Sequence, residues 1–196
     1  MSEPVYPFHA TRFDSRLGSI VAVADGNGAL VYLDFDDKNG PTPAPGAAAW
    51  RGHPVRWCVS QDVDGLARTA KQIAEYFAGD RTVFDLPVAP LGNDFHREVW
   101  SQLQLIPYGE TISYGALAAR IDRPGAARAV GRANGCNPIA IVIPCHRVIG
   151  ADGKLTGYSG GIERKAALLA LEMAATPAGQ RILPLDIVQG ALRRTR

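Results

Sequence analysis

The chain has 196 residues, of which 46% are hydrophobic and 20% charged, a balance that supports a packed core and excludes wholesale disorder. It contains no run of about 18 apolar residues and begins without a basic and apolar leader, so we expect neither a transmembrane helix nor a secretory signal. The formal net charge of +2 argues against a general basic coat for binding polyanions.

Residues 1–91 are predicted to form the first domain, a small β-sheet with one flanking helix. Two apolar runs, at residues 19–23 and 29–35, are separated by the sequence DGNG at 25–28, which is typical of a hairpin turn. Residues 36–52 then lack a clear period and are rich in Pro, Gly and Ala, which predicts a surface loop.

The rest of this domain is predicted to contain two more strands with the helix between them. The strands are expected at residues 55–59 and 83–88, and Pro87 places the second at a sheet edge. Asp62 is expected to cap the helix and Gly79 to end it. The apolar face of the helix is predicted from residues at helical spacing, namely Leu66, Ala70, Ile73 and Phe77.

The composition changes near Leu91, where we place a domain boundary. Residues 92–175 are expected to form a second, mostly helical domain, and residues 176–196 a C-terminal tail. Within this domain Asp94 is predicted to cap a first helix, which Pro107 breaks.

Two short helices across a tight turn follow. Ser113 is predicted to cap the first of them, and residues 126–134 form the second, which gives a helix-turn-helix outline. Residues 139–143 are entirely apolar and β-branched in part, which predicts a buried strand. A last helix is expected after residue 161 and carries Glu172.

Cys145 and His146 are adjacent at the end of the predicted buried strand. A thiol must become a thiolate to act as a nucleophile, and a nearby imidazole can take its proton. Neighbouring residues of a strand face opposite ways, so we expect Pro144 to break the strand and let both side chains serve one site. Glu172 is the candidate carboxylate to orient the imidazole. On residue type alone, a single cysteine is more often an apolar filler of the core.

Arginines concentrate in the second domain. The densest cluster consists of Arg120, Arg123, Arg128, Arg132 and Arg147. Arg128 and Arg132 are one helical turn apart among small residues, a helix that could approach a nucleic-acid groove closely. On charge alone, ordinary solvated arginines explain the cluster better than a contact with a polyanion, whereas for Arg128 and Arg132 on their helix both interpretations stay open.

Several further residues have two open interpretations. Tyr114 and Tyr158 line a base pocket or pack in the core. Asn137 precedes a proline and forms a turn, and its amide could hold neighbouring backbone groups in place. The glycines around Ser159 could form a pocket wall with exposed backbone.

Short motifs follow one another through residues 93–172. They are PYGET (107–111), SY (113–114), ARAVG (127–131), NG (134–135), NP (137–138), IPCHRV (143–148) and TGYSGG (156–161). In this order they strongly resemble the helix-turn-helix, recognition helix, asparagine hinge, acceptor-cysteine motif and binding-site loop of the O6-alkylguanine-DNA alkyltransferases. Residues 1–90 fit the variable N-terminal domain of that family in outline.

The resemblance implies a fold and a reaction. The fold would be α+β, with a small ribonuclease-H-like sheet domain followed by a mostly helical domain that contains the helix-turn-helix. The reaction would be direct repair of O6-alkylguanine in double-stranded DNA after the base is flipped out of the stack. Activity on O4-alkylthymine is left open.

The resemblance also implies roles for individual residues. Cys145 would attack the alkyl carbon as a thiolate, His146 would accept its proton through a water molecule, and Glu172 would polarise the imidazole. Tyr114 would donate a proton toward guanine N3, and Asn137 would brace the site. Val148, Tyr158 and Ser159 would line the base pocket beside Cys145. Arg128 would fill the vacated stack, and the other DNA-contacting residues would be Ser113, Tyr114, Ala127, Ala129, Gly131 and Arg132.

The product would be a thioether, whose sulfur is a poor leaving group, so each molecule should act once and needs no cofactor. The cysteines and histidines show no metal-ligand spacing, so we expect no metal site. We expect a monomer in the cytoplasm, and we leave open whether molecules pack side by side on DNA. The alternatives are a damage sensor or helix-turn-helix regulator without catalysis, and a thiol hydrolase.

Overall fold

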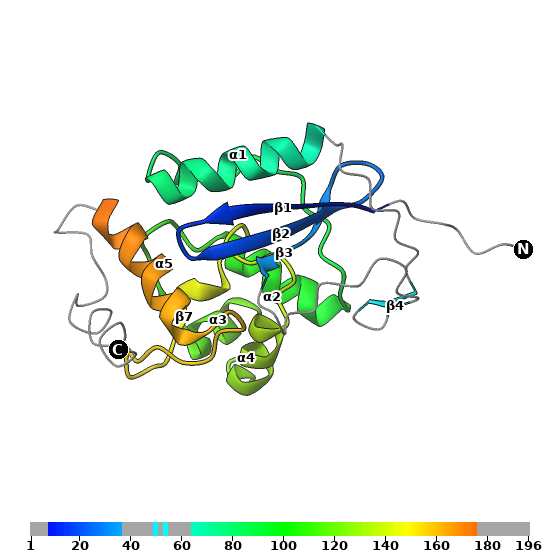
Figure 1. Cartoon of the computed structure of the whole chain (residues 1–196). Coiled ribbons are helices and arrows are strands. Elements are labelled where there is room, and N and C mark those ends of the chain that lie inside the picture. Colours follow the sequence, from blue (N-terminus) through cyan, green and yellow to red (C-terminus); the bar gives the residue numbers. More distant parts are fainter. Residues whose placement is uncertain (1–7, 37–48, 51–52, 55–63, 176–196) are drawn as a thin grey trace, which may run out of the picture. The chain divides into compact units, whose positions relative to one another are not determined.

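A computed structural model describes residues 8–36, 49–50, 53–54 and 64–175 (Figure 1). The predicted strand at 55–59, the cap at Asp62, most of the predicted loop and the tail lie outside the described residues. By its contacts the chain divides into two compact units, residues 1–90 and 91–196, which are described separately.

The first unit contains a three-stranded antiparallel sheet, ordered β1 (His9–Ser15), β2 (Gly18–Ala24) and β3 (Leu30–Phe35). The predicted hairpin is confirmed as β2 and β3, both deeply buried. The Asp25 carboxylate shapes its turn by accepting from the N–H groups of Asn27 and Ala29, each at 2.9 Å. The strand β1 was not predicted from the sequence, because this half-exposed edge strand carries few apolar residues.

A helix covers this sheet. α1 (Asp64–Ala78) packs against β1 and β2, as Figure 1 shows, and its buried residues include Leu66, Ile73 and Phe77 of the predicted apolar face. The helix ends at Gly79, whose φ of +87° favours glycine, as predicted.

The prediction of a strand at residues 83–88 is wrong except at the last residue. Val88 alone forms a bridge, parallel to Leu30. The Asp85 N–H donates to the Gln72 side chain of α1 at 2.9 Å, and that side chain donates to the Asp85 carbonyl at 3.0 Å. These backbone groups bond a side chain and therefore do not pair with a neighbouring strand. The predicted loop at 36–52 is also interrupted, because β4 (Ala49–Trp50) pairs with β5 (His53–Pro54).

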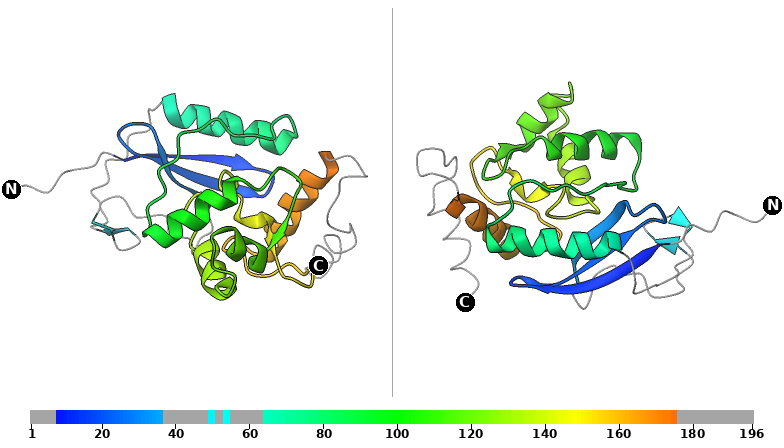
Figure 2. Two further views of the ribbon diagram at one scale, coloured as in Figure 1. Left: turned by 180° about the vertical axis from the view of Figure 1, so that it is seen from behind. Right: turned by 90° about the horizontal axis from the view of Figure 1, so that it is seen from above.

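The second unit is mostly helical (Figure 2). Its helices are α2 (Asp94–Gln104), α3 (Tyr114–Arg120), α4 (Ala127–Gly135) and α5 (Ile162–Ala175). Asn93, and not the predicted Asp94, caps α2 by accepting from the His96 N–H at 2.9 Å. Ser113 caps α3 as predicted. Two short parallel strands, β6 (Ile112–Ser113) and β7 (Val148–Ile149), join the start of α3 to the segment after Cys145.

Trp100 anchors the helices of this unit to one another. Its side chain is buried on α2, and its indole N–H donates to the Ala133 carbonyl of α4 at 2.9 Å. Leu117 of α3 and Val130 of α4 complete this core. No helix among the described residues is long and apolar enough to span a membrane.

Residues 139–143 form a turn and not the predicted strand. The Ile143 N–H donates to the Ile139 carbonyl at 3.0 Å, and Ile141 has a φ of +71°. Nearly all of the segment is buried, which explains its apolar composition. A buried turn is as stable as a buried strand provided that its backbone N–H and C=O groups have hydrogen-bond partners. The Asn137 side chain supplies part of that pairing.

Candidate active site

Cys145 and His146 lie on η1 (Cys145–Arg147), a single turn of 3-10 helix directly after Pro144. Both side chains are buried, with 2% and 0% of their surface exposed. Because η1 is a turn, the alternating directions of a strand do not apply to its side chains. The Cys145 N–H donates to the Ile143 carbonyl at 2.8 Å, so the turn before it fixes the backbone of the thiol.

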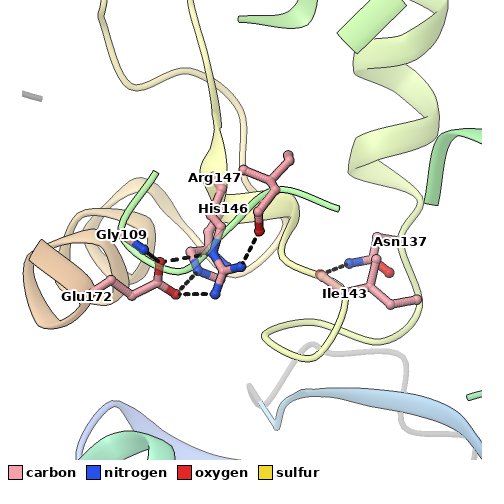
Figure 3. Close-up of polar contacts among 7 residues, drawn as sticks. Gly109, Asn137, Ile143, His146, Arg147 and Glu172 are labelled. Atoms are coloured by element: carbon pink, nitrogen blue, oxygen red, sulfur yellow. Dashed lines mark hydrogen bonds and ion pairs between the residues drawn. The ribbon is translucent and has the colours of Figure 1, made fainter. Parts of the chain in front are cut away.

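The His146 imidazole is fixed by Glu172 on α5. Nε2 of His146 lies 2.8 Å from Oε1 of Glu172, and neither side chain is exposed (Figure 3). Burial lowers the pKa of His146, more than the nearby carboxylate raises it, so the imidazole is neutral at neutral pH. The carboxylate can only accept, so Nε2 carries the proton and Nδ1 the lone pair of a base. Nδ1 has no hydrogen-bond partner among the described residues.

Arg147 and a backbone N–H hold Glu172 from the other side. The guanidinium donates from Nε to Oε2 and from Nη2 to Oε1, each at 2.9 Å, and the Gly109 N–H donates to Oε2 at 3.0 Å (Figure 3). Burial raises the pKa of Glu172, but His146 and Arg147 together lower it to about 2. The carboxylate is therefore ionised and locked in one orientation.

Arg147 does not belong to the predicted surface cluster of arginines. It is buried, its Nη1 donates to the Ile106 carbonyl at 2.6 Å, and it lies 5.7 Å from the centre of the Tyr108 ring. Arg123 pairs with Glu98 at 2.9 Å. The exposed cluster is thus smaller than the sequence suggested.

Two asparagines hold the backbone around Cys145. Asn137, a predicted site residue, donates to the Ile143 carbonyl at 2.8 Å (Figure 3). Its side chain also accepts from the Ile139 N–H at 3.1 Å. Asn134, on α4, donates to the Cys145 carbonyl at 3.3 Å. The sequence placed Asn134 in the NG motif without a role of its own, and the structure shows it on the face of α4 that also buries Val130.

The predicted pocket residues come from three segments. Tyr114 begins α3, and its hydroxyl donates to the Thr156 carbonyl at 3.4 Å. Burial raises the pKa of Tyr114, which keeps its hydroxyl protonated. Val148 is buried on β7. Tyr158 is half-buried and Ser159 exposed, in the loop just after Thr156.

The predicted DNA-contacting residues lie on α3 and α4. Arg128, Ala129 and Arg132 are exposed, whereas Ser113, Ala127 and Gly131 are partly buried. A Cβ at Gly131 would lie 3.6 Å from the ring of Tyr114, so a small residue here lets the two helices come close. This face of α4 thus carries two arginines on a surface of small residues.

Lys165 is a residue that sequence reasoning missed. It is fully buried on α5, and burial lowers its pKa to about 8. The sequence contained an indication of this placement, because Lys165 precedes Glu172 by two helical turns and so lies on the same face of the helix.

Among the described residues, no group of three or more His, Cys, Asp or Glu side chains could hold a metal ion. Cys145 is buried and Cys136 exposed, neither of them in a disulfide, and Cys58 lies outside the described residues. The chemistry that the site offers is therefore that of a thiol beside a neutral imidazole and a fixed carboxylate. Such a set can deprotonate the thiol and stabilise the imidazolium that forms.

Known proteins match the chain over most of its length. A family model described as the DNA-binding domain of 6-O-methylguanine DNA methyltransferase matches residues 94–174. The methylated-DNA–protein-cysteine methyltransferase of Mycobacterium bovis is 56% identical over 170 residues, 87% of this chain and 95% of that protein. The protein of that name from Methanosarcina acetivorans is 42% identical, over 82% of this chain and 95% of the relative.

Solved structures agree. The crystal structure of the Mycobacterium tuberculosis O6-methylguanine methyltransferase matches with a TM-score of 0.73 and 46% identity, over 87% of this chain and 96% of that one. A structure of the M. tuberculosis protein in complex with DNA also has a TM-score of 0.73, over the same shares of the two chains. The sequence identity, the fold and the buried cysteine site together show that the chain belongs to the methylated-DNA–protein-cysteine methyltransferase family.

Proposed function

We propose that the protein repairs O6-methylguanine in double-stranded DNA by transferring the methyl group irreversibly to Cys145. The observation that carries the proposal is the fixed set of groups beside the thiol, in which His146 is neutral, bonded through Nε2 to Glu172, and free to accept a proton at Nδ1. The relatives named above share this activity by name, and their similarity extends over most of the chain.

The proposed reaction is an in-line displacement at the methyl carbon. The Cys145 proton passes to His146 Nδ1 through a water molecule, and the ionised Glu172 stabilises the imidazolium. The sulfur–carbon bond forms as the carbon–O6 bond breaks. Tyr114 donates its proton toward N3 of the departing guanine; because burial raises the pKa of its hydroxyl, that proton is in place when the base leaves. A proton from solvent restores Tyr114.

The thioether product explains why each molecule would act once. A thiolate bound to a methyl carbon is a poor leaving group, so the thioether would not return to the thiol. The proposed reaction uses no cofactor.

We propose that α3 and α4 form the helix-turn-helix that binds the duplex. The exposed Arg128 would enter the base stack in place of the flipped guanine, and Arg132 would contact phosphate. The small residues Ala127, Ala129 and Gly131 would allow close approach, and Ser113 would face the DNA at the start of α3. In the first unit, the sheet with its parallel bridge at Val88 and the flanking α1 supports a ribonuclease-H-like domain.

The test is the intact mass of the protein after mixing with a duplex that contains one O6-methylguanine. We expect a gain of one methyl group per molecule, on the peptide that contains Cys145, and restoration of guanine in the DNA. The variant Cys145→Ser should stay unmodified, whereas Cys136→Ser, at the exposed thiol, should react like the wild type.

Two outcomes would contradict the proposal. A protein that binds the duplex while the lesion persists would be a damage sensor. A protein that turns over esters or peptides and keeps its original mass would be a thiol hydrolase.

A further inference from the structure

Asn134 is a buried polar side chain that the proposed chemistry does not use. It lies in the last turn of α4 with 2% of its surface exposed, and its amide Nδ2 donates to the Cys145 carbonyl at 3.3 Å. Its other polar atom, Oδ1, is buried without a hydrogen-bond partner among the described residues. An unpaired buried acceptor raises the free energy of the folded protein, so an asparagine is a costly residue at this position.

The surroundings of Asn134 would accept an apolar side chain of the same shape. Its buried neighbours on α4 are Val130 and Ala133. The Cys145 carbonyl would keep a donor without the amide, because the Val148 N–H closes η1 on the same oxygen. A leucine, which branches as asparagine does, would therefore leave no buried polar group unpaired. Neither packing nor the pairing of the backbone accounts for an asparagine here.

The amide of Asn134 joins the helix proposed to bind the duplex to the residue proposed to accept the methyl group. Arg128 is exposed on α4, and about 9 Å of helix separates it from Asn134. The carbonyl just before Asn134, that of Ala133, accepts from the Trp100 indole at 2.9 Å, which attaches the same turn to α2. Because a short helix moves as one body, a bond from its last turn to Cys145 fixes where Arg128 lies relative to the thiol.

We propose that Asn134 is a positioning residue that sets the distance between α4 and the acceptor thiol. A flipped guanine stays attached to its strand, so the reach of its methyl carbon to Cys145 depends on where α4 holds that strand. Arg128, in the vacated stack, would define one end of this distance and Cys145 the other. The inference rests on the proposed function and adds a residue to it, one that acts on the tethered base and not on the reactivity of the thiol.

The experiment compares wild type with Asn134→Leu and with a control, Asn93→Ala, which removes the cap of α2 and so lowers stability by another route. Two methyl-transfer rates are measured, one with protein saturating over an O6-methylguanine duplex and one with O6-methylguanine as the free base, which no strand tethers. The third quantity is the rate at which iodoacetamide alkylates the peptide that contains Cys145. The fourth is the midpoint of unfolding by denaturant.

Because a base misplaced by about 1 Å slows a reaction roughly a hundredfold, Asn134→Leu should lower the transfer rate from the duplex by at least about 10-fold. Transfer from the free base and alkylation by iodoacetamide should stay within about twofold of wild type, since Asn137 and the Val148 N–H still hold the backbone around Cys145. The unfolding midpoint should equal or exceed that of wild type, because the unpaired acceptor is gone. Asn93→Ala should unfold earlier yet transfer at the wild-type rate.

Transfer from the duplex by Asn134→Leu at the wild-type rate would overturn the inference. An equal loss with the free base or with iodoacetamide would also overturn it, because the effect would then lie at the thiol. If Asn134→Leu does not fold, Asn134→Ala, which removes the same bond with less volume, is held to the same three rates. A wild-type protein that accepts no methyl group would contradict the proposed function itself, a result distinct from any difference between the variants.

Discussion

Glu172 joins the chemistry of the site to its stability, because one carboxylate serves three partners. It orients His146, neutralises the buried Arg147 and accepts from the Gly109 backbone. A carboxylate used on both oxygens cannot rotate, so the imidazole is held in the tautomer that leaves Nδ1 free. The same contacts make Glu172 the counter-charge on which Arg147 depends.

Replacing Glu172 by Gln should therefore damage both properties. We expect the methyl-transfer rate to fall by about 10- to 100-fold, the usual cost of losing the group that orients a functional histidine. The free energy of unfolding should fall by about 3 kcal/mol or more, because the Arg147 charge stays buried without its partner. Single-turnover kinetics and denaturant unfolding measure the two effects.

Glu163→Gln is the matched control, since Glu163 lies in the exposed first turn of the same helix. It should leave both quantities within error of wild type. A Glu172→Gln protein that unfolds normally and reacts at the wild-type rate would show that the carboxylate is dispensable.

The sequence revealed only some of these residues. Cys145, His146 and Glu172 were predicted, because adjacent chemistry and a family motif identify them. Arg147 was assigned to the surface, since arginine is exposed by default and only the fold shows that a carboxylate 25 residues away faces it. Lys165 was missed for the same reason.

At the scale of elements, the turn at residues 139–143 is the clearest departure from expectation. A continuous apolar run is typical of a buried strand, yet here the Asn137 side chain bonds both ends of the segment and closes it into a turn. Local bonds from an asparagine side chain compete with extended structure in this way. By contrast, the hairpin of β2 and β3 and the cap of α3 were predictable, because their signals are local.

Asn137→Ala should weaken this turn. The Ile139 N–H and the Ile143 carbonyl are buried and would lose their partner, which costs about 1–3 kcal/mol for each unsatisfied group. We expect lower unfolding free energy and slower alkylation of Cys145, even by a small reagent such as iodoacetamide. As a comparison, Asn93→Ala removes the cap of α2 and should cost about 1 kcal/mol while the thiol keeps its reactivity. Equal thiol reactivity in both variants would refute a bracing role for Asn137.

The exposed face of α4 leads to a prediction about salt. Arg132→Ala should weaken binding to any duplex and lower the slope of log affinity against log salt by about 1, as expected for one lost phosphate contact. Alkylation of Cys145 by iodoacetamide should not change. Arg81→Ala, in the first unit and paired with Glu75, is the control and should leave the slope unchanged. An unaltered slope for Arg132→Ala would remove this residue from the DNA contact.

For the whole molecule, the buried ionisable groups set how stability depends on pH. The pKa of Glu172 is about 2 in the folded protein, against an ordinary value of 4.5, so its stabilisation of about 3 kcal/mol is complete above pH 4.5 and is lost as the pH falls toward 2. Burial also lowers the pKa of His146 from 6.5, so the unfolded chain takes up that proton first. Both groups therefore make the protein less stable in acid.

Unfolding by denaturant at pH 7, 4.5 and 3 should show a steady loss of stability. The loss should be smaller in Glu172→Gln, which is less stable at pH 7 and lacks one of the two titrating groups. Parallel pH curves for the two proteins would show that Glu172 does not titrate with folding.

The division into two units follows from where the packed residues lie. The first unit packs α1 on its sheet, and the second packs its helices around Trp100, so each has a core of its own. The sequence indicated a change near Leu91 through composition. The pairing of β1 could not be predicted from composition, because it depends on the neighbouring strand β2.

The indole of Trp100 has an optical consequence. It is the only tryptophan after Leu91, it stacks on the His96 ring with 5.3 Å between ring centres and 28° between the ring planes, and it donates to the last turn of α4 next to Asn134. Its emission therefore depends on a hydrogen bond to α4 and on the stacked imidazole beside it. The double variant Trp50→Phe, Trp57→Phe would carry a single tryptophan, whose emission, excited selectively over the six tyrosines, could follow the docking of α4 against a duplex in real time.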